Sequence, residues 1–248
     1  MLRCKIDQRA RHSTIGQHDE GTAMRNGAMT ALTMRDGGKI GVYHAHPRGA
    51  RRGGLVLVQE IFGVTDHIRA MCDGYADDGY EVLAPALFDR EAPGFAVGHD
   101  RLAEAAKLAN ETHDFALSIA DVQSCIDVLA PAGPVFIVGY CYGGSVAYRA
   151  ATACTGLAAA SGYYGRLIPL RFMDDAPRCP TILHFGRADA GIPMAGVEAL
   201  IARDHPGLEV FLYDAGHGFQ SDRQDAYDPA SAALARARTL ALFRAHGG

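Results

Sequence analysis

A cysteine framed by glycines is the residue of this sequence best suited to act as a nucleophile. Cys141 lies in Gly139-Tyr140-Cys141-Tyr142-Gly143-Gly144, after the predicted strand Pro134–Val138 and before a helix predicted to run to about Ala153. The spacing is that of the nucleophile elbow G-x-S-x-G, with cysteine in place of serine. Glycines are needed there because side chains would collide with the strand and the helix, and the helix N-terminus favours a thiolate. We therefore predict that Cys141 is a nucleophile and that the N–H of Tyr142 stabilises an oxyanion.

This segment has alternative readings. A buried cysteine in a glycine-rich turn can simply pack a helix against a strand. A phosphate-binding loop would require Gly-Lys-Ser/Thr and a dinucleotide fingerprint would require G-x-G-x-x-G, and the segment contains neither.

A nucleophile at such a turn requires an orienting acid and a histidine, which follow it in that order in this type of fold. Asp189 lies in the loop after the predicted strand Thr181–Phe185, and His217 lies between two glycines after the predicted strand Leu208–Tyr213. Both positions are at strand ends, where the sites of parallel sheets gather. The alternatives are a turn or capping role for the aspartate and a structural role for the histidine. We interpret four other histidines as structural: His67, His113, His184 and His205.

Glu60 follows the predicted strand Leu55–Gln59, which is a continuous apolar run. A carboxylate at the end of a buried strand is costly unless it is paired or functional. Near the thiol it could hold or accept the Cys141 proton, and the alternative is a structural carboxylate that supports the turn.

The elements that must position these residues alternate between strands and helices. Besides the strands above, we predict strands at Lys39–Tyr43, Glu81–Ala84 and Leu157–Ala160. Helices are predicted at Asp66–Asp78, with Asp66 as its cap, at two stretches of Asp100–Ala130 broken near Thr112–Asp114, at Pro193–Asp204 and at Pro229–Ala245. This alternation predicts an α/β fold, with a mostly parallel, doubly wound sheet and helices on both faces.

The composition restricts the functional class. The chain has 248 residues, and its 24 Lys+Arg against 28 Asp+Glu leave no basic footprint for nucleic acid. Its six cysteines form no C-x-x-C pair, and the N-terminal residues lack the apolar run of a signal peptide, so we expect reduced thiols and a cytoplasmic protein.

The uncharged stretch Val128–Tyr148 contains two prolines and four glycines, which favours a strand, a turn and a helix over a membrane span. Residues 1–28 are polar and are expected to be a disordered extension, and residues 29–248 a single domain.

The sequence resembles the dienelactone hydrolase family of α/β-hydrolases, which contains carboxymethylenebutenolidase. The resemblance runs from about residue 30 to the end and rests on four segments: Gln59–Gly63, Gly139–Gly144, the loop at Asp189, and Gly216–Phe219. It implies the α/β-hydrolase fold and a triad of Cys141, His217 and Asp189. It also implies that Glu60 lies in the active site and that Ile61 supplies the second oxyanion N–H.

The resemblance further implies arginines that bind the free carboxylate of a small lactone. Arg90 lies at the family's position for one of them, and the alternative is a surface arginine on a solvated loop. The family often has a second arginine four residues after the catalytic histidine, where this chain has Ser221. Arg223 is a candidate replacement. This departure bears on the substrate more than on the hydrolase chemistry.

The favoured function is therefore hydrolysis of a small, anionic, dienelactone-type lactone or ester through a thiol acyl-enzyme, with no metal or organic cofactor. Two alternatives remain: a general carboxylesterase or thioesterase of the same family, and a non-catalytic binding protein with this fold. A damaged triad would indicate the second alternative, and all three positions are intact. The expected partner is a small-molecule substrate, without nucleic acid or membrane, and the expected state is a monomer or a small homo-oligomer.

Overall fold

Strands that are apolar along their whole length form the centre of the sheet. In the computed structural model, which describes residues 27–248, every residue of β3 (Gly53–Val58) and β5 (Val135–Tyr140) is buried. Such strands are typical of parallel sheets covered on both faces. The other strands are β1 (Gly27–Thr33), β2 (Lys39–Ala45), β4 (Tyr80–Pro85), β6 (Leu157–Tyr163), β7 (Thr181–Gly186) and β8 (Leu208–Tyr213).

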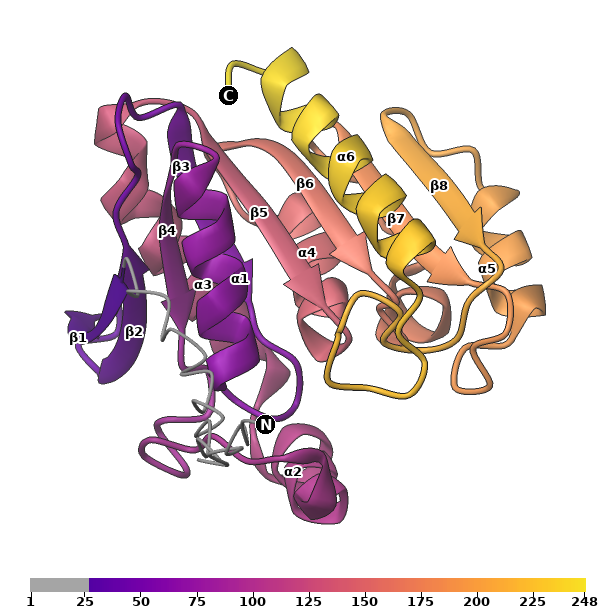
Figure 1. Cartoon of the computed structure of the whole chain (residues 1–248), viewed down its shortest axis with the longest axis horizontal. Coiled ribbons are helices and arrows are strands. Elements are labelled where there is room, and N and C mark those ends of the chain that lie inside the picture. The colour runs from indigo at the N-terminus through magenta and orange to yellow at the C-terminus, as the bar shows by residue number, and fades with distance from the viewer. Residues whose placement is uncertain (1–26) are drawn as a thin grey trace, which may run out of the picture.

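The eight strands form one sheet in the order β1-β2-β4-β3-β5-β6-β7-β8 (Figure 1). The strands from β4 to β8 run parallel, and β1 and β2 are antiparallel to their neighbours. The strand order reverses at β3, which has β4 on one side and β5 on the other. Sites of open α/β sheets form at this kind of switch point, beyond the carboxyl ends of the strands.

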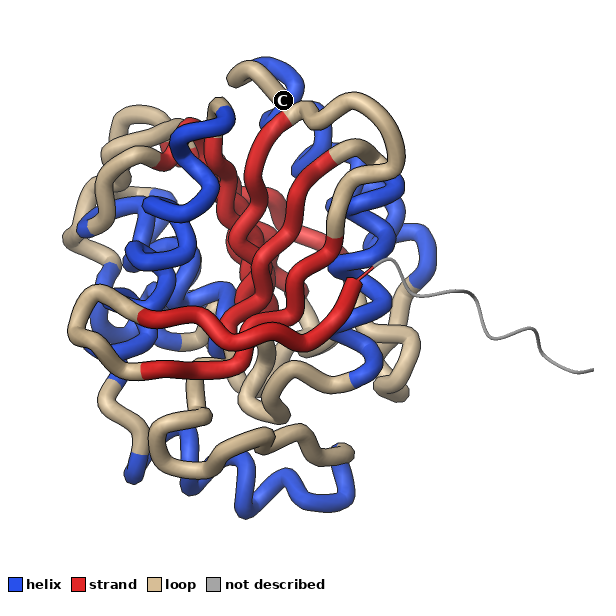
Figure 2. The backbone as a smooth tube through the Cα atoms, turned by 90° about the vertical axis from the view of Figure 1, so that its left-hand side faces the viewer, coloured by secondary structure: helices blue, strands red, loops and turns tan. Residues whose placement is uncertain are grey.

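Helices cover both faces of the sheet, as the alternation predicts. Residues of α1 (Asp66–Asp77) and α6 (Pro229–Ala245) pack in one core cluster, and those of α3 (Phe115–Leu129) in another with most of α4 (Tyr142–Ala153). Figure 2 looks from the β1 edge, with helices on either side of the strands. The remaining α-helices are α2 (Leu102–Lys107) and α5 (Met194–Ile201), and short 3₁₀ or π turns lie at His99–Arg101, Leu108–Thr112, Ala130–Ala132 and Ile168–Phe172.

One core helix could be mistaken for a membrane span. By length and composition alone, Phe115–Ala132 could cross a membrane, and it is the one such helix within residues 27–248. In the fold, α3 contacts β3, β4 and α4, and Val122, Cys125 and Ile126 are buried. The core helix of a soluble protein can have the same length and apolar composition as a membrane span.

The N-terminal part of the domain differs from the prediction. Residues 1–26 of the predicted extension lie outside the described residues, and Gly27 and Ala28 already belong to β1. The sequence does not indicate β1, because its apolar residues do not alternate with polar ones; in the structure none of its residues is fully buried. The cap of α1 is Thr65, not Asp66: the Thr65 hydroxyl accepts a hydrogen bond from the Ile68 N–H.

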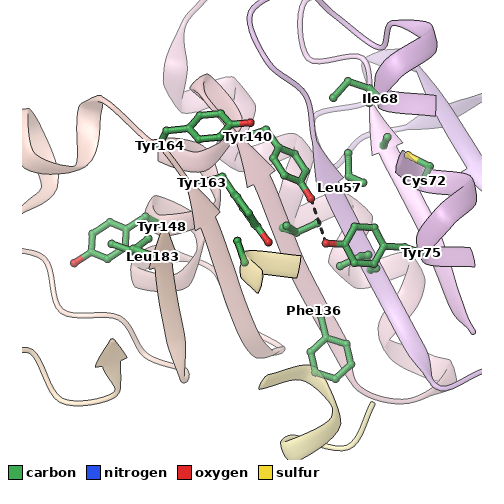
Figure 3. Packing of buried hydrophobic residues seen from close by; sticks show 14 of the residues in the cluster. Leu57, Ile68, Cys72, Tyr75, Phe136, Tyr140, Tyr148, Tyr163, Tyr164 and Leu183 are labelled. Atoms are coloured by element: carbon green, nitrogen blue, oxygen red, sulfur yellow. Dashed lines mark hydrogen bonds between the residues drawn. The ribbon is translucent and has the colours of Figure 1, made fainter. Parts of the chain in front are cut away.

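Buried tyrosines support the strands that end at the nucleophile turn (Figure 3). The hydroxyls of Tyr75 and Tyr140 lie 3.2 Å apart, and those of Tyr163 and Thr239 lie 2.7 Å apart. Because each buried hydroxyl has a partner, these rings bury apolar surface without leaving a polar atom unsatisfied. They fix the carboxyl ends of β5 and β6 directly beneath Cys141.

Candidate active site

The turn that carries Cys141 is strained and tightly packed. Cys141 has φ 54° and ψ −113°, a conformation that non-glycine residues rarely adopt, and its N–H donates to the Tyr163 carbonyl at 3.0 Å. A Cβ at Gly139 would overlap the Gly143 carbonyl oxygen, and a Cβ at Gly143 would overlap the Val58 carbonyl oxygen. Glycines are therefore required on both sides of the cysteine, for the steric reason that the sequence indicates.

The structure brings Cys141, His217 and Asp189 together. The His217 Nε2 lies 3.2 Å from the Cys141 Sγ, and its Nδ1 lies 2.6 Å from the Asp189 Oδ2. The other oxygen of the Asp189 carboxylate accepts the Gly191 N–H at 2.8 Å. The aspartate side chain is 1% exposed, so the imidazole is held between a fixed acceptor and the sulfur.

These contacts set the protonation of the imidazole. Burial lowers the pKa of His217, but the hydrogen bonds with Asp189 and Cys141 outweigh burial and raise the pKa to about 10. An imidazolium is therefore favoured at neutral pH, and it lies 3.2 Å from the Cys141 sulfur.

Tyr164 forms a wall beside the imidazole. Its ring lies 5.0 Å from that of His217, it is 1% exposed, and its backbone adopts φ 38°. No local motif indicates this residue, since it comes from the end of β6 and meets the histidine only in the fold.

The two predicted oxyanion donors lie beyond neighbouring strands. Ile61 follows β3 and Tyr142 begins α4, directly after the cysteine. Within residues 27–248 the Ile61 N–H makes no hydrogen bond, and the N–H of a first-turn residue such as Tyr142 has no intrahelical acceptor. Both groups are thus available to an oxygen at the crevice.

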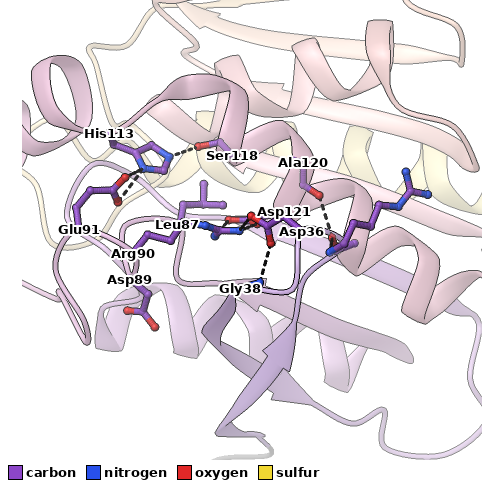
Figure 4. A network of polar contacts seen from close by, with 12 residues as sticks. Asp36, Gly38, Leu87, Asp89, Arg90, Glu91, His113, Ser118, Ala120 and Asp121 are labelled. Atoms are coloured by element: carbon purple, nitrogen blue, oxygen red, sulfur yellow. Dashed lines mark hydrogen bonds and ion pairs between the residues drawn. The ribbon is translucent and has the colours of Figure 1, made fainter.

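The Tyr142 side chain is anchored by a buried polar chain, most of which Figure 4 shows. Its hydroxyl lies 2.9 Å from the Ser118 Oγ, which lies 2.9 Å from the His113 Nε2, and the His113 Nδ1 lies 3.0 Å from both Glu91 carboxylate oxygens. These contacts hold the side chain of the first residue of α4 in place. This arrangement is consistent with the interpretation of His113 as a structural histidine.

Glu60 is buried at the same crevice, 4% exposed. Burial raises its pKa to about 7, and the charge of His217 and a 3.3 Å hydrogen bond from the Gln224 amide offset burial only in part. Within the described residues, Glu60 makes no hydrogen bond to the Cys141 sulfur, whose partner is His217. The sequence does not indicate Gln224 as its partner, since the two residues are far apart in the chain.

Two adjoining cavities open at these residues. A cavity of about 570 Å³ is lined by Cys141 and His217 together with Ile61, Phe62, Leu102 and Ala226. A second, of about 710 Å³, is lined by His67, Arg69 and Ser221, among others. Both cavities share four lining residues: Glu60, Phe62, His99 and Arg223. The combined space is large enough for a small-molecule substrate.

Arg90 lines neither of these cavities, so the structure gives no support to its prediction as a substrate ligand. Its guanidinium donates to both oxygens of Asp121 at 2.7 and 2.8 Å and to Asp36 at 2.8 Å (Figure 4). The Asp121 side chain is 0% exposed, so Arg90 compensates a buried charge. Arg223, by contrast, lines both cavities and its side chain is 69% exposed.

Comparison with known proteins agrees with this architecture. The profile of the dienelactone hydrolase family matches residues 40–247. The chain belongs to the dienelactone hydrolase family. It is 32% identical over 222 residues to a carboxymethylenebutenolidase of Pseudomonas putida, covering 85% of this chain and 93% of the relative. It is 29% identical over 224 residues to carboxymethylenebutenolidase 1 of Cupriavidus pinatubonensis, covering 86% and 94%.

A solved structure shows the same fold. A structure described as a dienelactone hydrolase from Klebsiella pneumoniae superposes with a TM-score of 0.77 at 29% identity, covering 88% of this chain and 98% of that one. The predicted α/β-hydrolase fold is confirmed, and the chain is a hydrolase of the dienelactone hydrolase type.

The position of Arg90 gives a first prediction. Replacing it in Arg90→Met leaves the buried Asp121 carboxylate without its cation, which should lower the free energy of unfolding by about 3–5 kcal/mol. The KM of the folded enzyme should stay unchanged, because Arg90 lines neither cavity. Urea denaturation and steady-state kinetics measure the two quantities. A raised KM with unchanged stability would return Arg90 to the substrate site.

The buried carboxyl of Glu60 gives a second prediction. Its pKa of about 7 lies above its ordinary value of 4.5, so the native chain binds more protons than the unfolded chain between these pH values. The contribution of Glu60 to the free energy of unfolding is fully present below pH 4.5 and is lost as the pH rises through 7. Glu60→Gln should remove this loss, which is about 3 kcal/mol at about 1.4 kcal/mol per pKa unit. Urea denaturation from pH 4.5 to 8 measures it, and parallel curves for the two proteins would contradict the assignment.

Proposed function

We propose that this hydrolase opens small lactones or esters through a thiol acyl-enzyme formed on Cys141, with His217 as the base and Asp189 as the residue that orients it. The observation that carries the proposal is the continuous contact from the Asp189 carboxylate through the imidazole to the sulfur, at 2.6 and 3.2 Å. A cysteine, a histidine and a buried acid in this arrangement are the parts that nucleophilic catalysis requires.

In the first half of the reaction, the Cys141 thiolate attacks the substrate carbonyl and the N–H groups of Ile61 and Tyr142 stabilise the oxyanion. The tetrahedral intermediate collapses by breaking the C–O bond. The departing alkoxide takes the proton from the His217 imidazolium. The acyl group remains bound to the Cys141 sulfur as a thioester. In a lactone the ring opens and the alcohol stays attached to the acyl group.

In the second half, water releases the acyl group. The contact with the cysteine is one of the interactions that raise the pKa of His217, so forming a neutral thioester lowers that pKa. A neutral imidazole can then accept a proton from water as the water attacks the thioester. The carboxylic acid leaves, and the thiolate and the imidazolium are restored.

The cationic lining of the larger cavity favours an anionic substrate. Its cations are Arg69 and Arg223, against Asp66 and a Glu60 that burial keeps largely protonated below pH 7. His67 also lines this cavity, but burial lowers its pKa, so its imidazole adds no cation at neutral pH. We assign the substrate carboxylate to this cavity, with the carbonyl at Cys141 in the smaller one.

A second candidate function is hydrolysis of a neutral ester, by a general carboxylesterase of the same family. The apolar residues Phe62, Leu102 and Ala226 in the wall beside the sulfur favour it, as does the engagement of Arg90 by Asp121.

The proposed nucleophile predicts how the thiols react. Cys72, Cys125 and Cys154 are buried and their pKa values are raised by burial, so among the described cysteines Cys141 should alkylate fastest with iodoacetamide. Cys141→Ala should lower kcat/KM about 10³-fold or more, while the matched variant Cys179→Ala should retain activity. Peptide mass spectrometry locates the label. Activity retained in Cys141→Ala would refute the acyl-enzyme.

The two candidate substrates are separated by kcat/KM on a carboxylated dienelactone and on a neutral short-chain aryl ester. If the anion site operates, Arg223→Ala should raise KM for the dienelactone about tenfold, since hydrogen bonds to charged groups contribute about 1.5–3 kcal/mol. KM for the neutral ester should not change. The matched control is Arg244→Ala, another exposed arginine that lines neither cavity. Equal effects on both substrates would favour the general esterase.

A further inference from the structure

A second group of possible ligand atoms lies at the opposite end of the sheet from Cys141. His44, His46 and Glu81 each offer one ligand atom, and these atoms all lie within 4.8 Å of one another. Glu81 is the second residue of β4, at its amino end, whereas Cys141 and Glu60 follow the carboxyl ends of parallel strands. The group is therefore separate from the proposed catalytic site.

The register of the sheet brings the three side chains together. The antiparallel pair β2–β4 places His44 opposite Leu83 and Ala45 opposite Val82. His46 directly follows β2, and continuing this register by one residue places it beside Glu81. Side chains two residues apart on a strand point to the same face. The two histidines and the cross-strand glutamate thus share one face of the sheet, near the amino end of β4.

The distances suit a metal ion. The His44 Nε2 lies 3.0 Å from the Glu81 Oε1, and the two imidazole rings have centroids 4.0 Å apart. Two ligands that each lie about 2.0–2.1 Å from a tetrahedral ion are separated by roughly 3.3 Å, so small side-chain rotations suffice. Two histidines and one carboxylate, with water in the fourth position, form a ligand set that zinc accepts, and imidazole also suits nickel and copper.

The glutamate is held in place by a third element. Arg51 donates from Nε to the Glu81 Oε2 at 2.7 Å, and its other nitrogens donate to the carbonyls of Ala132 and Leu129. The hydrogen bond from Arg51 orients the carboxylate, with Oε1 directed at His44. The Arg51 charge opposes a cation and moderates the affinity.

We propose that His44, His46 and Glu81 form a binding site for one divalent transition-metal ion of the zinc type, which links β2 to β4. The ion replaces the hydrogen bond between His44 and Glu81 with two coordinate bonds and adds His46, which is exposed. Because the ion binds the folded chain and cross-links the antiparallel strand to the parallel sheet, it stabilises the fold by mass action. It takes no part in the hydrolysis.

Calorimetric titration of the full chain with ZnCl₂, paired with thermal melts with and without zinc, tests this site. The wild type should bind one ion at this site and gain in Tm. His46→Ala should weaken this binding at least tenfold and lose the gain in Tm, because it removes one of three ligands from an exposed position that the fold does not need. MgCl₂, a hard cation that prefers oxygen ligands, should leave Tm unchanged.

Two control variants exclude other zinc ligands. Cys141→Ala removes the cysteine that faces His217, and His246→Ala removes another exposed histidine; both should bind zinc as the wild type does. His44→Ala should repeat the loss seen for His46→Ala. The proposal is overturned if the wild type shows no zinc-dependent rise in Tm, if His46→Ala binds zinc as the wild type does, or if only Cys141→Ala loses binding.

Discussion

The close approach of α4 to the ends of β3 and β5 is the constraint on which the candidate site depends. Side chains at Gly139 or Gly143 would overlap backbone carbonyl oxygens, and without this approach Cys141 could not hold its φ of 54°. The same approach sets the first turn of α4, which begins at Tyr142, beside the end of β3, which Ile61 follows. A single packing requirement thus positions the sulfur and brings both predicted oxyanion donors to neighbouring strand ends, and the hydrogen-bonded tyrosines of β5 and β6 support it.

Burial then decides the charges around the sulfur. His217 retains a proton because its partners outweigh burial, whereas Glu60 retains one because burial outweighs the charge of His217 and the hydrogen bond from the Gln224 amide. A carboxylate ionised at Glu60 would repel both the thiolate and an anionic substrate, since the two cavities share its side chain. With Glu60 protonated, the field of Arg69 and Arg223 acts on the substrate with less opposition. The raised pKa of Glu60 therefore supports the proposed anion site.

The sequence predicts best where local rules decide the structure. Cys141, Asp189 and His217 each follow an apolar strand and lie near glycines, so their convergence at one edge follows from the fold class, and α6 has the predicted bounds Pro229–Ala245. Residues whose position depends on distant partners could not be predicted. β1 is exposed and exists because β2 offers it an edge, and Tyr164 and Gln224 reach the site only through β6 and the loop after His217. Arg90 has the family's position, but Asp121 of α3, which engages it, carries no local signal.

The ion pair of Arg90 is an argument for placing the proposed anion site at other cations. Asp121 is fully buried, so its carboxylate would lose its cation if Arg90 moved away to bind a substrate carboxylate. The free energy gained from binding the substrate would be offset by the cost of the unpaired buried charge. A useful cation must instead lack a buried partner. Arg223 fits, since its side chain is mostly exposed and its contact with the exposed Asp222 is 3.5 Å long. Arg69 fits as well: its side chain lines the larger cavity, and its ion pair with the exposed Asp66 is 3.8 Å long. An incoming carboxylate at the larger cavity would meet both guanidinium groups without breaking a buried ion pair, so the two arginines favour a substrate whose charge lies on the α1 side of the site.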